Sequence, residues 1–293
     1  NFLKPAMVVT LLANGVNVLA NWVFIFGNLG VPQMGVVGAG IATICSRVFM
    51  AVVLIWIVMV SPEMKIFDPS LRYRKIDFSM MKKLLSIGIP AGCQYFFEVS
   101  AFAASSIMVG WIGTIPLAAH QIALSLASVS FTVAMGISAA GSIQVSHALG
   151  RRDLQATRVA GFSTAILCGG FMASAGLVFI MFRHLLPGLY ISQKEVMDIA
   201  ATLLIIVAFF QISDGTQAVG LGILRGLTDM KLPTLFTLVA YWGIGLPTGY
   251  FLGFSLGWGI YGVWIGLLAS LTASGVLMMT RFHLKTRTTR MPA

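Results

Sequence analysis

Long apolar runs alternate with short polar segments along the chain, and this pattern predicts eight membrane-spanning helices. About 20 consecutive apolar residues are enough to cross the hydrocarbon core of a bilayer as a helix. We expect such spans at residues 5–27, 36–60, 86–111, 116–143, 159–182, 197–222, 233–253 and 258–280. A polar connector at 61–85 follows the second span, and its last part has the pattern of a short amphipathic helix on the membrane surface. The fold class is therefore an all-α membrane protein.

The composition agrees with this pattern. Of the 293 residues, 58% are hydrophobic and only 10% are charged, whereas soluble domains carry about 25% charged residues. The net charge of +10 does not indicate a nucleic-acid partner, because the basic residues lie between the apolar runs. We expect the lipid bilayer to be the surroundings of this chain and exclude nucleic acid as a partner.

The basic residues also predict the orientation of the spans. All lysines and arginines except Arg47, Arg183 and Lys194 fall in the chain start, the 61–85 connector, the loops at 144–158 and 223–232, or the C-terminal tail. These segments share one compartment if eight spans alternate in direction. Basic loops face the cytoplasm, so both ends of the chain are expected to be cytoplasmic.

A repeat relates the first two spans to the last two. Its matched positions, in the same order in both copies, are Pro5, Gly27 and Gly38 in the first and Pro233, Gly253 and Gly262 in the second. Repeats in the same orientation are a known transporter architecture. Because four spans precede the second copy, we expect four further spans, about 150 residues, to precede the first copy in the whole protein.

This repeat predicts a twelve-helix protein made of two six-helix lobes. The expected division is 1–60 for the last two helices of the N-terminal lobe, 61–85 for a cytoplasmic connector, 86–283 for the C-terminal lobe and 284–293 for a cytoplasmic tail.

Only two of the nine acidic residues, Glu98 and Asp214, lie deep within predicted spans. Glu98 is 15 residues from both Lys83 and Gly113, or about 22 Å from either end of its helix. Asp214 is 11 residues before Arg225, or roughly 16 Å from the cytoplasmic end. A charge at the bilayer centre costs about 2.5–3.5 kcal/mol on insertion scales, so such residues are functional candidates. The other seven acids are expected to be solvated.

Polar side chains accompany both deep acids at helical spacing. The supporting candidates are Gln94, Gln211, Ser213 and Gln217. Carboxylate, amide and hydroxyl oxygens suit a hard cation such as sodium, and the same groups could take a proton or pair with an organic cation. The alternative is that each acid is protonated and hydrogen-bonds its glutamine between helices.

The other candidate residues are Arg47, His120 and Gln121. Arg47 and His120 each have two possible interpretations. Arg47, 12 residues into its span, is either a counter-ion or anion site, or an arginine satisfied by backbone carbonyls. His120, next to Gln121 near the outer end of its span, is either a packing residue or a proton-sensitive site. No metalloprotease, hydrolase or phosphate-loop motif is present, so we expect no enzyme activity and no cofactor beyond a coupling ion.

The stretch at 115–160 resembles the multidrug and toxic compound extrusion (MATE) family. Its recognisable parts are Ala119-His120-Gln121 and Gly150-Arg151-Arg152-Asp153, and Phe96-Phe97-Glu98 and Gln217-Ala218-Val219-Gly220 strengthen the match. The resemblance extends over essentially the whole chain, to the NorM-like bacterial branch. It implies that this chain contains helices five to twelve of a twelve-helix protein.

The resemblance implies a multidrug efflux antiporter of the bacterial inner membrane. Such a protein exports organic cations and drugs by alternating access, in exchange for sodium or protons. The family's cation-binding acids map onto Glu98 and Asp214. Sodium-linked relatives often carry a tyrosine one turn before the second acid, where this chain has Phe210. We expect the full-length protein to be a monomer. The alternatives are a lipid-linked precursor flippase, which would favour a cluster of arginines beyond Arg47, and a non-transporting membrane scaffold.

Overall fold

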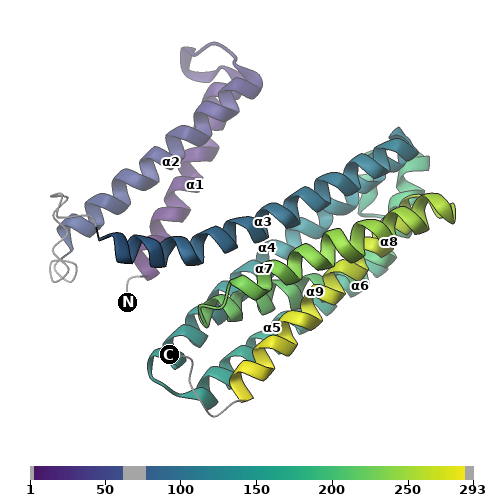
Figure 1. Ribbon diagram of the computed structural model, residues 1–293. Helices are drawn as coiled ribbons and strands as arrows, with labels where there is room; N and C mark the ends of the chain where they lie inside the picture. The colour runs from purple at the N-terminus through teal and green to yellow at the C-terminus, as the bar shows by residue number, and fades with distance from the viewer. Residues whose placement is uncertain (1–2, 62–76, 288–293) are drawn as a thin grey trace. The chain divides into compact units, whose positions relative to one another are not determined.

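The computed structural model describes residues 3–61 and 77–287 and contains the eight predicted spans. Each span except the seventh is one continuous helix (Figure 1). Their bounds are α1 (Leu3–Phe26), α2 (Gly35–Val60), α3 (Phe78–Ile112), α4 (Thr114–Gly150), α5 (Leu154–Met181), α6 (Lys194–Gly226) and α9 (Ile260–Arg287). The described residues contain no β-strand. The prediction of an all-α membrane protein is confirmed.

The start of α3 differs from the prediction. A separate surface helix was expected at the end of the 61–85 connector, but α3 is one helix of 35 residues from Phe78. Its first turns therefore include the amphipathic segment, and Pro90 lies inside the helix. Residues 62–76 of the connector lie outside the described residues.

The chain divides into two compact units, Asn1–Asp77 and Phe78–Ala293. The first contains the α1–α2 pair. Gly38 allows these helices to approach closely, because a Cβ there would overlap the backbone carbonyl of Phe24. In the second unit a Cβ at Gly262 would overlap the backbone of Leu252 and Gly253. The two glycines that the repeat aligned thus make the same kind of backbone contact in their own units.

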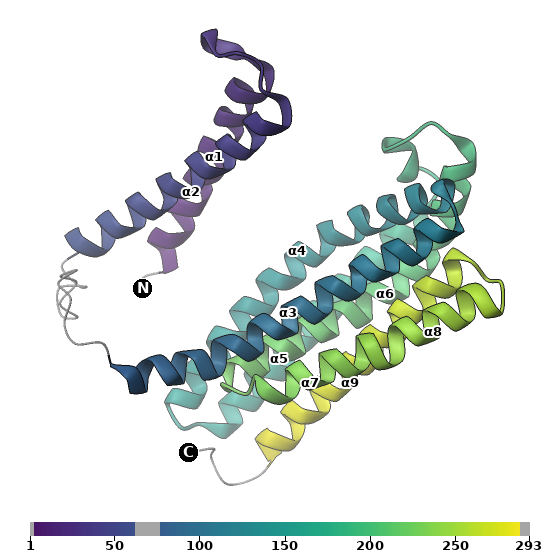
Figure 2. The same ribbon diagram turned by 45° about the horizontal axis from the view of Figure 1, so that its top comes forward.

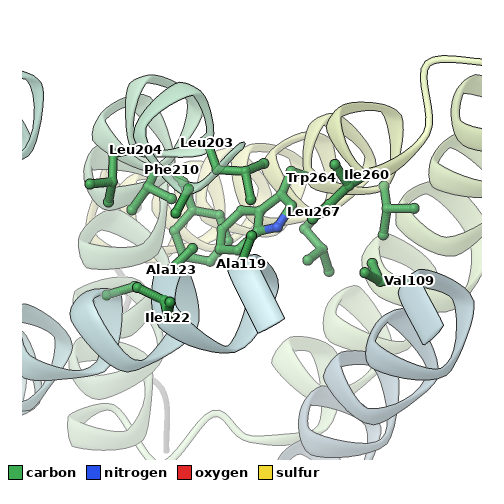
Figure 3. Packing of buried hydrophobic residues seen from close by; sticks show 14 of the residues in the cluster. Val109, Ala119, Ile122, Ala123, Leu203, Leu204, Phe210, Ile260, Trp264 and Leu267 are labelled. Atoms are coloured by element: carbon green, nitrogen blue, oxygen red, sulfur yellow. The ribbon is translucent and has the colours of Figure 1, made fainter. Parts of the chain in front are cut away.

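The second unit is a helical bundle in which α6 packs against α4, α5 and α9 (Figure 2). Helix α3 runs beside the seventh span in both views. One buried cluster brings Phe210 of α6 and Trp264 of α9 together beside Ala119 and Ala123 of α4 (Figure 3). The rings of Phe210 and Trp264 meet edge to face, with 5.4 Å between their centroids. This contact helps to fix how α6 and α9 are turned toward each other.

The seventh span, Lys231–Ser255, is not a regular α-helix. It consists of α7 (Lys231–Leu238), the π-helical turn η4 (Val239–Gly245), α8 (Leu246–Tyr250) and a second π-helical turn, η5 (Phe251–Ser255). Pro247 has no backbone N–H and removes one helical hydrogen bond just after η4. Wide turns of this kind frequently occur at functional sites.

Asp229, in the turn between α6 and α7, was predicted to be solvated, and this is wrong. Its carboxylate accepts from Arg281 Nε at 3.0 Å and from Lys285 Nζ at 2.8 Å, both on α9. Burial by itself would raise the pKa of Asp229, but the hydrogen bonds and charges of Lys285 and Arg281 outweigh it and lower that pKa. These two ion pairs therefore connect the turn between α6 and α7 to the end of α9.

Candidate functional site

Glu98 lies in the middle of α3 with a polar partner one helical turn away. Gln94 Nε2 donates a hydrogen bond of 2.7 Å to Glu98 Oε2. Only 2% of the surface of Gln94 is exposed, whereas Glu98 is partly buried. The spacing of four residues places both side chains on the same face of the helix. The predicted pairing of Glu98 with Gln94 is therefore present.

Helix α6 supplies the second acid and a second amide. Asp214 and Gln217 are both buried, with exposed fractions of 6% and 2%. Gln217 lies within hydrogen-bonding range of Glu98 on α3, and Asp214 is near enough to Glu98 for their charges to interact. The structure thus brings together the two acids that the sequence singled out, although 116 residues separate them.

The seventh span adds a residue that the sequence analysis missed. Tyr241 in η4 is 1% exposed, and its hydroxyl donates a hydrogen bond of 2.8 Å to Gln217 Oε1. Next to it, Trp242 Nε1 donates to the backbone carbonyl of Phe97 at 3.2 Å. A tyrosine carries no charge, so its presence in an apolar span gives no sign of a polar site. The one sequence signal near it is Pro247, because a proline inside a span predicts a break in the helix.

We call Gln94, Glu98, Asp214, Gln217 and Tyr241 the carboxylate cluster. Tyr241 occupies Oε1 of Gln217, so the N–H groups of that amide remain for Glu98. Both amides of the cluster therefore present donors to one carboxylate. Two nearby carboxylates repel each other when both are ionised, and this repulsion favours uptake of a cation between or beside them.

Gln211 and Ser213 of α6 do not join the carboxylate cluster through a hydrogen bond. Gln211 is fully buried, and neither atom of its amide has a partner among the described residues. The hydroxyl of Ser213 instead meets Thr272 of α9 at 2.8 Å.

Phe210 lies one turn before Asp214 and faces the aromatic core. Its ring is edge-on to Phe102 at 6.3 Å and to Trp264 at 5.4 Å. Phe102 in turn lies 5.9 Å from the ring of Tyr241. The phenol hydroxyl near the acids is thus supplied by Tyr241 from the seventh span, and not by the residue at position 210.

His120 and Gln121 are consecutive residues of α4, and their side chains lie on different sides of the helix. His120 is fully buried, with Nε2 3.0 Å from the hydroxyl of Ser106 and its ring edge-on to Trp264 at 5.6 Å. Gln121 is exposed. The placement of His120 fits the packing interpretation, because Ser106 and Trp264, its two neighbours here, lie outside the carboxylate cluster.

Arg47 belongs to the first unit and lies on α2. It is exposed and lines a pocket between α1 and α2. Glu98 and Asp214 belong to the second unit. Among the described residues, no group of three or more His, Cys, Asp or Glu side chains is arranged to hold a metal ion.

Known proteins similar to this chain are multidrug resistance proteins of bacteria. The chain is 39% identical over 287 residues to a probable multidrug resistance protein NorM of Brucella suis biovar 1. It is 42% identical over 277 residues to the multidrug resistance protein NorM of Burkholderia vietnamiensis. These matches cover 96% and 93% of this chain but 61% and 59% of the relatives. The chain thus spans about three fifths of the length of these relatives.

The fold matches solved MATE transporters. A crystal structure of a eukaryotic MATE transporter superimposes with a TM-score of 0.84 at 22% identity, covering 94% of this chain and 61% of that one. At this identity the match concerns the fold alone.

The sequence model of the MatE family matches residues 90–251, more than half of the chain. The matched part contains every member of the carboxylate cluster, from Gln94 to Tyr241. The predicted resemblance is confirmed: the chain belongs to the MatE family, which is a family of membrane transporters and not of enzymes.

Proposed function

We propose that this chain is the larger part of a secondary active antiporter of the bacterial inner membrane, which exports organic cations and drugs in exchange for sodium or protons. Its bacterial relatives are named multidrug resistance proteins, which supports the substrate class. Residues 1–60 would then end the first lobe, the 61–85 segment would connect the lobes in the cytoplasm, and residues 86–283 would form the second lobe. The full-length protein would act as a monomer, with both ends of this chain cytoplasmic.

The observation that carries this proposal is the carboxylate cluster. Glu98 and Asp214 bring two negative charges close together inside an apolar bundle, where each charge is costly. A sodium ion, a proton or a cationic substrate would relieve their repulsion. Gln94 donates a hydrogen bond to Glu98, and the hydroxyl of Tyr241 donates one to Gln217. These polar groups can rearrange around a bound cation.

Exchange follows if the coupling cation and the substrate affect each other's binding. A cation that binds Glu98 and Asp214 from outside would favour release of the substrate, and loss of that cation to the cytoplasm would favour substrate uptake. Such coupling is reciprocal, because each ligand changes the affinity of the other by the same factor. The broken seventh span, which contacts α3, supplies an element that can bend during the change.

Two alternatives fit the structure less well. A flippase for a lipid-linked pyrophosphate would need several arginines deep in the spans, and Arg47 alone among the arginines lies within a predicted span. A non-transporting scaffold gives no reason for two acids placed together in a membrane bundle, since buried ionisable groups in spans are costly.

The test is efflux of a fluorescent organic cation such as ethidium by full-length protein in proteoliposomes. Sodium and proton gradients are imposed separately, so that the coupling cation is read directly. Glu98→Gln and Asp214→Asn should each abolish gradient-driven efflux while the protein still elutes as a folded species. Glu195→Gln is the matched control, because Glu195 is exposed in the first turn of α6. Efflux at the wild-type rate by Glu98→Gln protein would refute the proposal.

A further inference from the structure

Helices α5 and α9 come close together at one end of the second unit. A Cβ at Gly161 of α5 would overlap the ring of Phe282 on α9. About one turn earlier in α5, Nη2 of Arg158 lies 3.4 Å from Nδ1 of His283, which is on α9. Two basic side chains from different helices therefore meet where the helices are in contact.

The depth of this contact follows from the lengths of the two helices. Each has 28 residues and is therefore about 42 Å long, while a bilayer with its headgroup layers is about 40–45 Å thick. Arg158 lies four residues after the start of α5, and His283 lies four residues before the end of α9. Both are thus about 6 Å from a helix end. This depth is the level of the lipid headgroups, on the side that the basic loops predict to be cytoplasmic.

The guanidinium of Arg158 is oriented by two aromatic rings. Its Cζ lies 5.7 Å from the centroid of the Phe162 ring, and the ring of Phe162 is edge-on to that of His283 at 6.1 Å. A guanidinium has no acceptor atom, so Nδ1 of His283 accepts the hydrogen bond and the neutral ring carries its hydrogen on Nε2. Among the described residues of the second unit, the remaining N–H groups of this pair have no further hydrogen-bond partner. They can therefore donate to an anion.

The basic residues at the end of α9 lie on two different faces. Arg281 and Lys285 turn to the α6–α7 turn, where both bind Asp229. His283 and Arg287 are also four residues apart, so they share another face of the helix. Arg287 is exposed and adds a positive charge one turn beyond His283. We call Arg158, His283 and Arg287 the basic contact.

Apolar side chains continue from the basic contact toward the middle of the membrane. On α5, Phe162 and Ile166 follow Arg158 at intervals of four residues, and on α9, Val276 precedes His283 by seven. Residues at these spacings lie on one side of a helix. Ile166 and Val276 are 76% and 57% exposed in this chain. This order of groups fits a molecule with an anionic head and an apolar tail.

We propose that the basic contact binds the phosphate of an anionic phospholipid of the cytoplasmic leaflet, with an acyl chain lying along α5 and α9. The inference goes beyond the proposed transport function and does not depend on it. The cytoplasmic leaflet is negatively charged, and basic pockets between spanning helices on this side suit anionic headgroups. An arginine offers paired N–H donors that match the oxygens of a phosphate. A zwitterionic lipid also carries a cationic group, which the basic contact repels.

The proposal competes with two other roles. In the first, Arg158 packs on Phe162 and pairs with an acid elsewhere in the full-length protein. This role predicts that removal of the guanidinium affects all lipids alike. In the second, the basic contact binds a soluble organic phosphate, and this role predicts that a phosphate without acyl chains binds there.

The experiment measures lipid binding to purified full-length protein by native mass spectrometry. The probes are dioleoylphosphatidylglycerol, which is anionic, dioleoylphosphatidylcholine, which has the same chains and no net charge, and glycerol 3-phosphate, which has no chains. Wild-type protein should bind phosphatidylglycerol more tightly than phosphatidylcholine. Arg158→Met should weaken phosphatidylglycerol roughly 5- to 50-fold, as expected for a lost charge-assisted hydrogen bond, and leave phosphatidylcholine within about twofold.

Arg225→Met is the matched control, because Arg225 is an exposed basic residue in the last turn of α6. It should change phosphatidylglycerol binding by less than about twofold, since an isolated surface charge contributes little. Arg158→Lys keeps the charge without the fork and should weaken phosphatidylglycerol by less than Arg158→Met does.

Three results would overturn the proposal. They are equal effects of Arg158→Met and Arg225→Met, equal weakening of both lipids by Arg158→Met, and displacement of phosphatidylglycerol by glycerol 3-phosphate. The last of these would assign the basic contact to a soluble phosphate. If Arg158→Met does not fold, Arg158→Lys replaces it in the same comparisons, and unchanged phosphatidylglycerol binding by that variant would also overturn the proposal.

Discussion

Replacing Tyr241 with phenylalanine removes one hydroxyl from the carboxylate cluster. This hydroxyl holds Oε1 of Gln217 at 2.8 Å, and both residues are almost fully buried. With Oε1 occupied, Gln217 can present only its N–H groups to Glu98. In the antiport mechanism that we propose, those donors would stabilise the charged carboxylate when no cation is bound, and would so compete with the coupling cation.

The direction of the effect follows from this competition. In the Tyr241→Phe variant the amide of Gln217 is free to turn its oxygen toward a bound cation. A hydrogen bond to a charged group contributes about 1.5–3 kcal/mol. Partial loss of such a bond corresponds to about 1–2 kcal/mol, which changes an equilibrium constant by a factor of about 5 to 30. We expect the concentration of coupling cation that half-saturates efflux to fall by that factor. Maximal efflux should slow, because the cation leaves more slowly.

The assay is gradient-driven efflux of ethidium in proteoliposomes at varied sodium or proton concentration, together with thermal unfolding of the purified protein. The lost buried hydrogen bond should also lower the free energy of unfolding by about 1–2 kcal/mol. Tyr250→Phe is the control, since Tyr250 is 53% exposed in the same span. An unchanged or higher half-saturating concentration in Tyr241→Phe would show that the hydroxyl does not orient Gln217.

Two further predictions concern stability and are measured by thermal unfolding. Gly38→Ala should destabilise the α1–α2 pair by about 1–3 kcal/mol, because its Cβ overlaps a backbone carbonyl. Gly40→Ala, with nothing within 4 Å of its Cβ, should be neutral or stabilising, so equal effects of the two would contradict the packing argument. Asp229→Asn should cost about 1–3 kcal/mol at pH 7, since its bonds to Arg281 and Lys285 depend on the carboxylate charge. A lowered pKa means that this stability is present above the usual aspartate pKa and is lost as pH falls through the lower folded value. The difference between variant and wild type should therefore vanish in acid, and a difference that persists there would refute the assignment.

The eight spans, the two deep acids and the family resemblance were all predictable from the sequence. Apolar runs and the rarity of charge within them are properties of each segment by itself, because every segment meets the same bilayer. The pairing of Gln94 with Glu98 was predictable for a similar reason, since a spacing of four residues already places both side chains on one helical face. The repeat likewise pointed to Gly38 and Gly262 before their backbone contacts were known.

Only the tertiary structure showed which side chains meet. The hydrogen bond from Tyr241 to Gln217 depends on the rotation of α6 and of the broken seventh span about their axes, and that rotation is set by packing against other helices. Sequence spacing does not contain this information. For the same reason Asp229 was wrongly expected to be solvated, since its partners lie 52 and 56 positions away on α9. The sequence by itself thus determined which segments enter the membrane and which charges go with them, while packing between helices decided which of those groups lie together.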